Sequence, residues 1–142
     1  MFDTTHFHPM LVHFPIALTM VGLLFEIVRF FFCKTESKLP CGEALLYLAT
    51  VSAVFALLAG FFFTAQLSGK PLEMRNIHLI LGIISTVSLL LTSFFYLVAR
   101  FGKQEEKIFP VTGLLLYAFS VLLIGVTGFV GGKLVYTYMI GL

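Results

Sequence analysis

The chain has 142 residues, of which 59% are hydrophobic and only 11% carry a charge. Soluble domains average about one charged residue in four, so the composition excludes an ordinary soluble protein and indicates an integral membrane protein. The net charge of +2 is too small to indicate a nucleic-acid partner. No internal repeat is evident, and we expect a single transmembrane domain over residues 1–142.

Four apolar runs follow one another along the chain, at about residues 10–32, 44–67, 77–99 and 108–132. Each reaches the ~20 residues that a helix needs to cross a bilayer. The runs do not alternate between polar and apolar residues as the strands of a membrane barrel do. Short polar connections make consecutive helices antiparallel neighbours. The sequence therefore predicts an all-α protein, an up-down bundle of four transmembrane helices.

The basic residues that flank these runs predict the orientation of the bundle. Basic residues concentrate on the cytoplasmic side of membrane proteins. One side of the predicted bundle has six of them and the other has three: Arg29, Lys34, Lys38, Arg100, Lys103 and Lys107 against Lys70, Arg75 and Lys133. Both termini are therefore expected on the outer side.

All four histidines are expected at this outer end. His6, His8 and His13 stand at the start of the first run, and His78 stands at the start of the third. Up-down threading brings these two starts to the same side. Ionisable groups within membrane spans are costly and usually functional, so the grouping indicates a shared ligand.

A haem is the ligand that two such histidines fit best. A b-type haem takes one axial histidine from each of two facing helices, and we expect His13 and His78 to hold one haem b, with His8 as a supporting or alternative ligand. A zinc or copper site wants three or four ligands. Here His8, His13 and His78 supply three, with no acid or cysteine at their depth. Pro9 and Pro15 do not determine the residue at which the first helix begins. Either His8 or His13 can therefore be the ligand from this helix.

Small and basic residues accompany the histidines. Glycines near their depth offer room for a porphyrin: Gly60, Gly125, Gly128, Gly131 and Gly132. Gly128 and Gly132 also have the spacing of closely packed membrane helices. Arg75 and Lys133 are expected beside the haem propionates, unless they reach for lipid headgroups instead.

Other polar residues have structural explanations. Glu26 and Arg29 are three residues apart, close enough to pair on one helix. The hydroxyls of the third run are expected to bond within it or to a neighbouring helix: Ser85, Ser88, Thr92 and Ser93.

The stretch "HPMLVHFPIAL", the histidine that opens the third run and the ending "GGKLVYTYMIGL" resemble a bacterial inner-membrane family known only as a domain of unknown function. The resemblance covers nearly the whole chain and places the family's histidines at His8 and His13. Related domains occur beside cytochrome c and Rieske-type iron–sulfur domains. Tyr138 stands where relatives often have a histidine, so no ligand is expected from the C-terminal tail.

Three interpretations remain open. The first is a small b-type cytochrome of the inner membrane, which passes electrons to other membrane redox subunits or a periplasmic cytochrome, with quinone as a further candidate partner. The second is a cofactor-free subunit that assembles with a larger membrane complex. The third is a protein that binds zinc or copper through its histidines. None of them is expected to catalyse a reaction by itself.

Overall fold

The computed structural model describes residues 7–32, 41–62, 67–101 and 108–138. This part of the chain forms five helices: α1 (Phe7–Leu11), α2 (His13–Phe32), α3 (Cys41–Phe62), α4 (Lys70–Phe101) and α5 (Ile108–Tyr138). The last four are long and apolar enough to cross a membrane. The first of these four spans begins at His8, so it includes part of α1 as well as α2. The predicted all-α bundle of four spans is confirmed for these residues. His6, Lys34, Lys38, Lys103 and Lys107 lie outside them.

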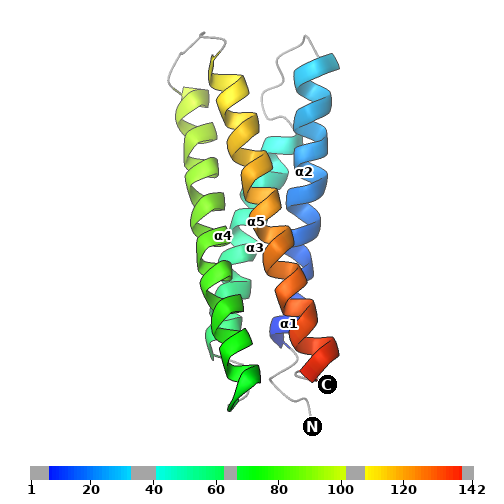
Figure 1. The fold of residues 1–142 in the computed structure, drawn as a ribbon. Helices are drawn as coiled ribbons and strands as arrows, with labels where there is room; N and C mark the ends of the chain where they lie inside the picture. The colour runs from blue at the N-terminus through cyan, green and yellow to red at the C-terminus, as the bar shows by residue number, and fades with distance from the viewer. Residues whose placement is uncertain (1–6, 33–40, 63–66, 102–107, 139–142) are drawn as a thin grey trace.

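The long helices form a closed ring in chain order (Figure 1). α2 packs mainly against α3, and α4 against α5. Contacts of α3 with α4 and of α5 with α2 close the ring. α1 and the C-terminal end of α5 lie at the end of the bundle where α2 and α4 begin. We call this end, which contains His8 and His78, the histidine end.

The helices differ from the predicted runs at their ends. Val12 separates α1 from α2, so Pro15 falls in the first turn of α2, where its missing N–H is not needed. α4 begins at Lys70, seven residues before the predicted start, because Gly69 adopts φ +67° and its carbonyl accepts the first backbone hydrogen bonds of the helix. α5 continues to Tyr138. Hydropathy marks the hydrocarbon layer, whereas the helices extend beyond it.

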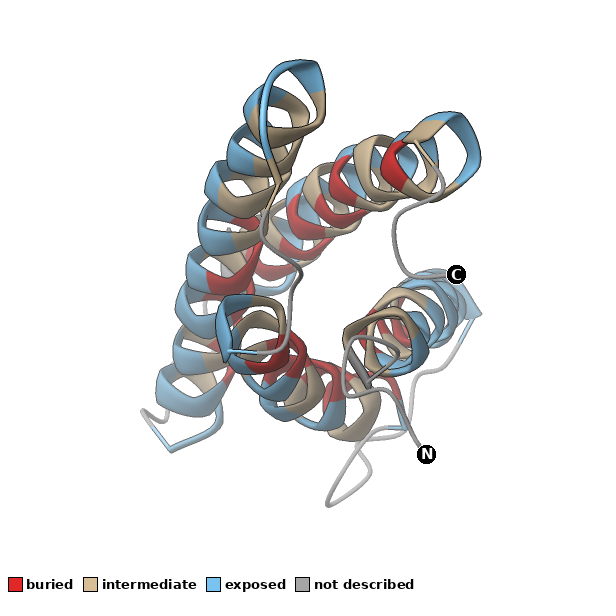
Figure 2. Ribbon diagram, turned by 90° about the horizontal axis from the view of Figure 1, so that it is seen from below, coloured by how far each residue is buried: buried red, intermediate tan, exposed pale blue. Residues whose placement is uncertain are grey.

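Small and hydroxyl-bearing side chains fill the interior, and large apolar ones point outward (Figure 2). This is the arrangement expected when lipid surrounds a bundle and close packing holds it together. Hydroxyl pairs also cross between helices: Thr50 with Ser93, Ser85 with Thr127, and Ser120 with both Ser88 and Thr92, at 2.7 to 3.0 Å. The bonds expected of the hydroxyls in the third run are confirmed.

The buried residues of α2 and α4 follow the same spacing. Seventy positions relate the four buried residues of α2 to four of the five buried residues of α4: Pro15, Thr19, Gly22 and Glu26 match Ser85, Leu89, Thr92 and Tyr96. Glu26 lies on Gly42, and Tyr96 lies on Gly113, seventy-one positions after Gly42. The hairpins α2–α3 and α4–α5 thus bury residues at corresponding positions.

Candidate cofactor site

His8 is held in place by the backbone of α3. α1 packs against α3, and the Nδ1 of His8 lies 2.9 Å from the carbonyl oxygen of Ala56. A carbonyl oxygen only accepts hydrogen bonds, so Nδ1 carries the proton and donates. The lone pair of this imidazole is therefore on Nε2.

His78 is held in the same way by α5. Its Nδ1 lies 3.1 Å from the carbonyl oxygen of Thr127, so Nδ1 again donates and Nε2 keeps the lone pair. The Thr127 hydroxyl bonds to Ser85 at 2.8 Å and to its own helix, which fixes the segment that supplies this carbonyl. α3 thus holds the imidazole of His8, and α5 that of His78, each by a backbone carbonyl.

Each imidazole also lies against a glycine, one helical turn beyond the carbonyl that it bonds. A Cβ added at Gly60 would lie 2.8 Å from Cε1 of His8, and one added at Gly131 would lie 2.8 Å from Cε1 of His78. Real Cβ atoms essentially never approach other atoms so closely. Any other residue at these two positions would push the ring away from its carbonyl.

The rings of His8 and His78 lie next to each other, edge to face. Their centroids are 5.9 Å apart, and their planes are inclined by 72°. Both rings are half-buried and line a cavity of about 600 Å³ at the histidine end. This volume is within the ~300–1,000 Å³ typical of sites for small molecules and cofactors. Most of the lining is apolar, with contributions from Val12, Ile16, Leu57, Leu79, Ile124 and Val135.

His13 lines the same cavity, but its side chain is exposed and it does not face His78 as His8 does. The residue of the first span that lies beside His78 is therefore His8. The two histidines stand five residues apart, so on one continuous helix they would already point about 140° away from each other.

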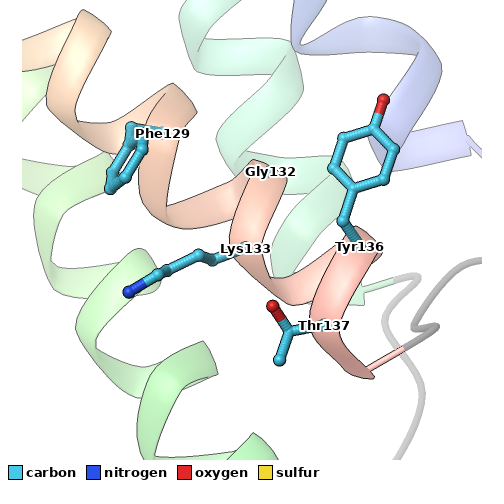
Figure 3. Close-up of a pocket in the computed structure, with 5 residues that line it drawn as sticks. All are labelled: Phe129, Gly132, Lys133, Tyr136 and Thr137. Carbon is cyan, nitrogen blue, oxygen red and sulfur yellow. The ribbon is translucent and has the colours of Figure 1, made fainter.

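The predicted basic residues occupy two different places. Arg75 is half-buried and lines the histidine cavity. Lys133 is exposed and lines a neighbouring depression of about 280 Å³, made by residues of α5 alone (Figure 3), which shares Gly132 and Tyr136 with the histidine cavity. Its Nζ lies 5.9 Å from the centroid of the Phe129 ring. Arg75 is thus the basic residue placed at the cavity.

The predicted glycines have unequal roles. Gly60 supports His8, and a Cβ at Gly128 would lie 3.1 Å from Cδ1 of Ile16, so α5 approaches α2 closely there. Gly125 and Gly132 have open space where a Cβ would be, although Gly132 also lines the cavity.

The chain matches one family of known proteins. The model of a family described as a predicted membrane protein, DUF2231, matches residues 4–142. The chain belongs to this family. No curated protein and no solved structure matched the chain.

The donor set of this DUF2231 protein suits a planar macrocycle with two axial positions. Two imidazoles that bind one metal ion from opposite sides, each at about 2 Å, have ring centroids about 6 Å apart, close to the 5.9 Å seen here. Within the described residues, no group of three or more histidine, cysteine or acidic side chains could hold a metal ion. Two imidazoles fall short of the three or four protein ligands of a zinc site but meet the axial needs of a haem.

Sequence reasoning missed two residues that build this site, Ala56 and Thr127. Both act through backbone carbonyls, which leave no trace in side-chain chemistry. The matched spacing of the two hairpins is the one signal that could have found them. Gly131 is one of the glycines that the sequence places near the histidines. His8 lies seventy positions before His78, and Ala56 and Gly60 lie seventy-one before Thr127 and Gly131.

Proposed function

We propose that this membrane protein is a small b-type cytochrome that holds one haem b between His8 and His78. The observation that carries the proposal is the matched pair of imidazoles. Each has its proton fixed on Nδ1 by a backbone carbonyl, so each presents the unprotonated Nε2 that a metal requires. A hydrogen bond on the second nitrogen is the usual partner of a metal-bound histidine.

The surroundings of the pair support a haem over a bare ion. The apolar cavity offers the walls that a porphyrin needs, and Gly60 and Gly131 keep the backbones close to the rings. Arg75, which lines the cavity, is the residue expected to pair with a propionate. Bound haem would supply one-electron redox chemistry. The protein's part is to fix both imidazoles and to exclude water from them, and burial and axial ligands set the potential.

Electron transfer is the function that follows from two axial histidines. With both axial positions filled by protein, the site has no position for oxygen and suits electron exchange with a partner. We propose that the protein lies in a bacterial inner membrane with its termini and the haem toward the periplasm. Its electron partners would be other membrane redox subunits, a periplasmic cytochrome or quinone.

Absorption spectra of the purified protein, oxidised and dithionite-reduced, test the proposal. Sharp reduced bands are expected in the wild type and should be lost in His8→Ala and in His78→Ala. His13→Ala is the matched control, because it removes an exposed imidazole that lines the same cavity, and it should keep the bands. Loss of the bands in His13→Ala with their retention in His8→Ala would move the ligand to His13. A colourless wild type, folded and expressed with ample haem, would leave the cofactor-free assembly subunit as the better interpretation.

A further inference from the structure

The depression on α5 that Lys133 lines faces outward from the bundle. Its lining consists of Phe129, Gly132, Lys133, Tyr136 and Thr137, and the three large side chains among them are exposed. Figure 3 shows the side chains of Lys133 and Tyr136 on opposite sides of Gly132. The space between them exists because Gly132 has no side chain, and a Cβ added there would meet nothing within 4 Å.

The depression lies where α5 leaves the hydrocarbon layer. α5 has 31 residues, whereas about 20 suffice to cross the apolar part of a bilayer. Lys133 stands five residues before Tyr138, the last residue of the helix, which is about 8 Å at 1.5 Å per residue. Tyrosines such as Tyr136 gather at the boundary between hydrocarbon and headgroups. Lys133 is therefore expected at the level of the lipid phosphates.

Lys133 brings a positive charge to this apolar surface. It is the only charged residue among the described residues that line the depression. The ion pairs of the described part of the chain are made by Arg29 and Arg100, not by Lys133. Its ammonium instead lies 5.9 Å from the centroid of the Phe129 ring, a contact that is weak at an exposed site. The charge is therefore available to an anion from outside the protein.

Thr137 supplies a second donor beside Lys133. It follows the lysine by four residues, a spacing that makes two side chains neighbours on a helix. An ammonium has three donors, and a hydroxyl can add one. Together they suit an anion with several oxygen atoms, such as a phosphate. Phe129 lies on the hydrocarbon side of the lysine, so apolar surface begins directly beside this pair of donors.

We propose that the depression binds one anionic phospholipid. Its phosphate would lie at Lys133 and the Thr137 hydroxyl, and the first part of one acyl chain would lie over Gly132, between Phe129 and Tyr136. Because Gly132 and Tyr136 also line the histidine cavity, the lipid would lie against the wall of that cavity. The site itself does not require haem.

Charge complementarity selects this ligand over the other occupants that a membrane offers. A quinone has no charge to pair with the ammonium. A second copy of the chain, packed on this face about a two-fold axis, would present the same surface. It would bring a second Lys133 toward the first, and like charges repel.

A lysine near the end of a helix can also reach the headgroups without binding a particular lipid. The space over Gly132 distinguishes the two cases. General attraction to headgroups depends on the charge of Lys133 alone, whereas a site for one lipid depends on the charge and on the space for its acyl chain.

Native mass spectrometry of the full-length protein in a neutral detergent resolves each bound lipid and tests the proposal. The probes are dioleoyl phosphatidylglycerol, which is anionic, and dioleoyl phosphatidylcholine, which has the same chains but no net charge. The wild type should bind one phosphatidylglycerol more tightly than phosphatidylcholine. Lys133→Gln should weaken phosphatidylglycerol binding by about fivefold, the equivalent of the ~1 kcal/mol that a lysine contributes at an anionic membrane surface. Lys70→Gln is the matched control and should change little, because Lys70 is exposed at the same end but lines neither the depression nor the histidine cavity.

Gly132→Leu tests the position of the acyl chain. The open space at this residue accepts a side chain without a clash, and leucine would fill the depression while Lys133 remains. Phosphatidylglycerol binding should weaken. Gly125→Leu is the control, because a Cβ there also meets nothing within 4 Å and Gly125 lines neither the depression nor the cavity.

Four results would overturn the proposal, each for variants that stay folded as judged by circular dichroism. One is equal affinity of the wild type and Lys133→Gln for phosphatidylglycerol. Another is an equal loss in Lys70→Gln, which would indicate general attraction of charge. The third is unchanged affinity in Gly132→Leu. The fourth is tighter binding of decylubiquinone than of phosphatidylglycerol, lost in Gly132→Leu, which would make the occupant a quinone. None of these measurements depends on haem, so the outcome is separate from that of the proposed function.

Discussion

Replacing Gly131 by alanine tests whether the glycines hold the imidazoles in place. The new Cβ would lie 2.8 Å from Cε1 and 3.3 Å from Nδ1 of His78, whereas ordinary contact begins near 3.4 Å. The ring must therefore move by about 0.6 Å or more. The hydrogen bond from Nδ1 to the Thr127 carbonyl is already 3.1 Å long, so such a shift takes it to or beyond the limit of a useful bond.

The expected loss of haem affinity in Gly131→Ala has two contributions, a lost hydrogen bond and strain from overpacking. Loss of a neutral hydrogen bond is worth about 1 kcal/mol, and strain from overpacking adds about 1–3 kcal/mol. Together they predict haem binding weaker by about one to three factors of ten, at about 1.4 kcal/mol each. Folding of the apoprotein should change less, because alanine is better than glycine in a helix by about 1 kcal/mol.

Gly125→Ala is the matched control, because a Cβ there meets nothing within 4 Å and Gly125 does not line the cavity. The assay is titration of each purified full-length variant with haem, followed by absorption, with thermal melting by circular dichroism alongside. Gly60→Ala should behave like Gly131→Ala, since a Cβ there lies 2.8 Å from Cε1 of His8. Equal haem affinity in Gly131→Ala and Gly125→Ala would refute the reasoning.

Three further predictions concern the bundle. Ser120→Ala removes hydrogen bonds of 2.7 and 3.0 Å to two hydroxyls of α4. In detergent unfolding it should lower the free energy of unfolding by about 1 kcal/mol, at ~0.6 kcal/mol per interhelical bond. Ser52→Ala is the control, because its hydroxyl bonds only its own helix, and equal effects of the two changes would contradict the role of cross-helix bonds. Arg100→Ala leaves the buried Glu43 without its cation and should lower the free energy of unfolding by about 2–3 kcal/mol. This is less than the ~3–5 kcal/mol expected for a fully buried pair, because the guanidinium is 26% exposed. An unchanged free energy of unfolding would show that the pair contributes nothing. Tags at the two termini should both be reachable from the periplasm of intact cells, as the basic residues predict, and labelling only from the cytoplasm would invert the topology.

Hydropathy predicted the architecture because a bilayer imposes a length and a composition on each span. The four apolar runs correspond to the four long helices, and the pair of Glu26 with Arg29 follows from their spacing on one helix. The partner of Glu43 was not predictable, because Arg100 stands fifty-seven residues away on another helix. Which residues of two helices meet depends on the rotation of each helix about its own axis. A span that is apolar on every face does not specify that rotation.

The candidate site was predicted in part for the same reason. Threading alone placed His8, His13 and His78 at one end. Which histidine of the first span lies beside His78 depends on the rotation of that span about its axis. Likewise, rotation of α5 decides that Gly131, rather than Gly125 or Gly132, lies against an imidazole.

Stoichiometry and spin state of the bound haem test the central claim most directly. The full-length wild-type protein, expressed with ample haem and purified, would be assayed for haem per chain and examined in its oxidised form by electron paramagnetic resonance. Two imidazoles 5.9 Å apart that both offer Nε2 predict one haem per chain with the low-spin signal of two axial histidines. A folded protein without haem, or one with a high-spin haem that has an open axial position, would contradict the account.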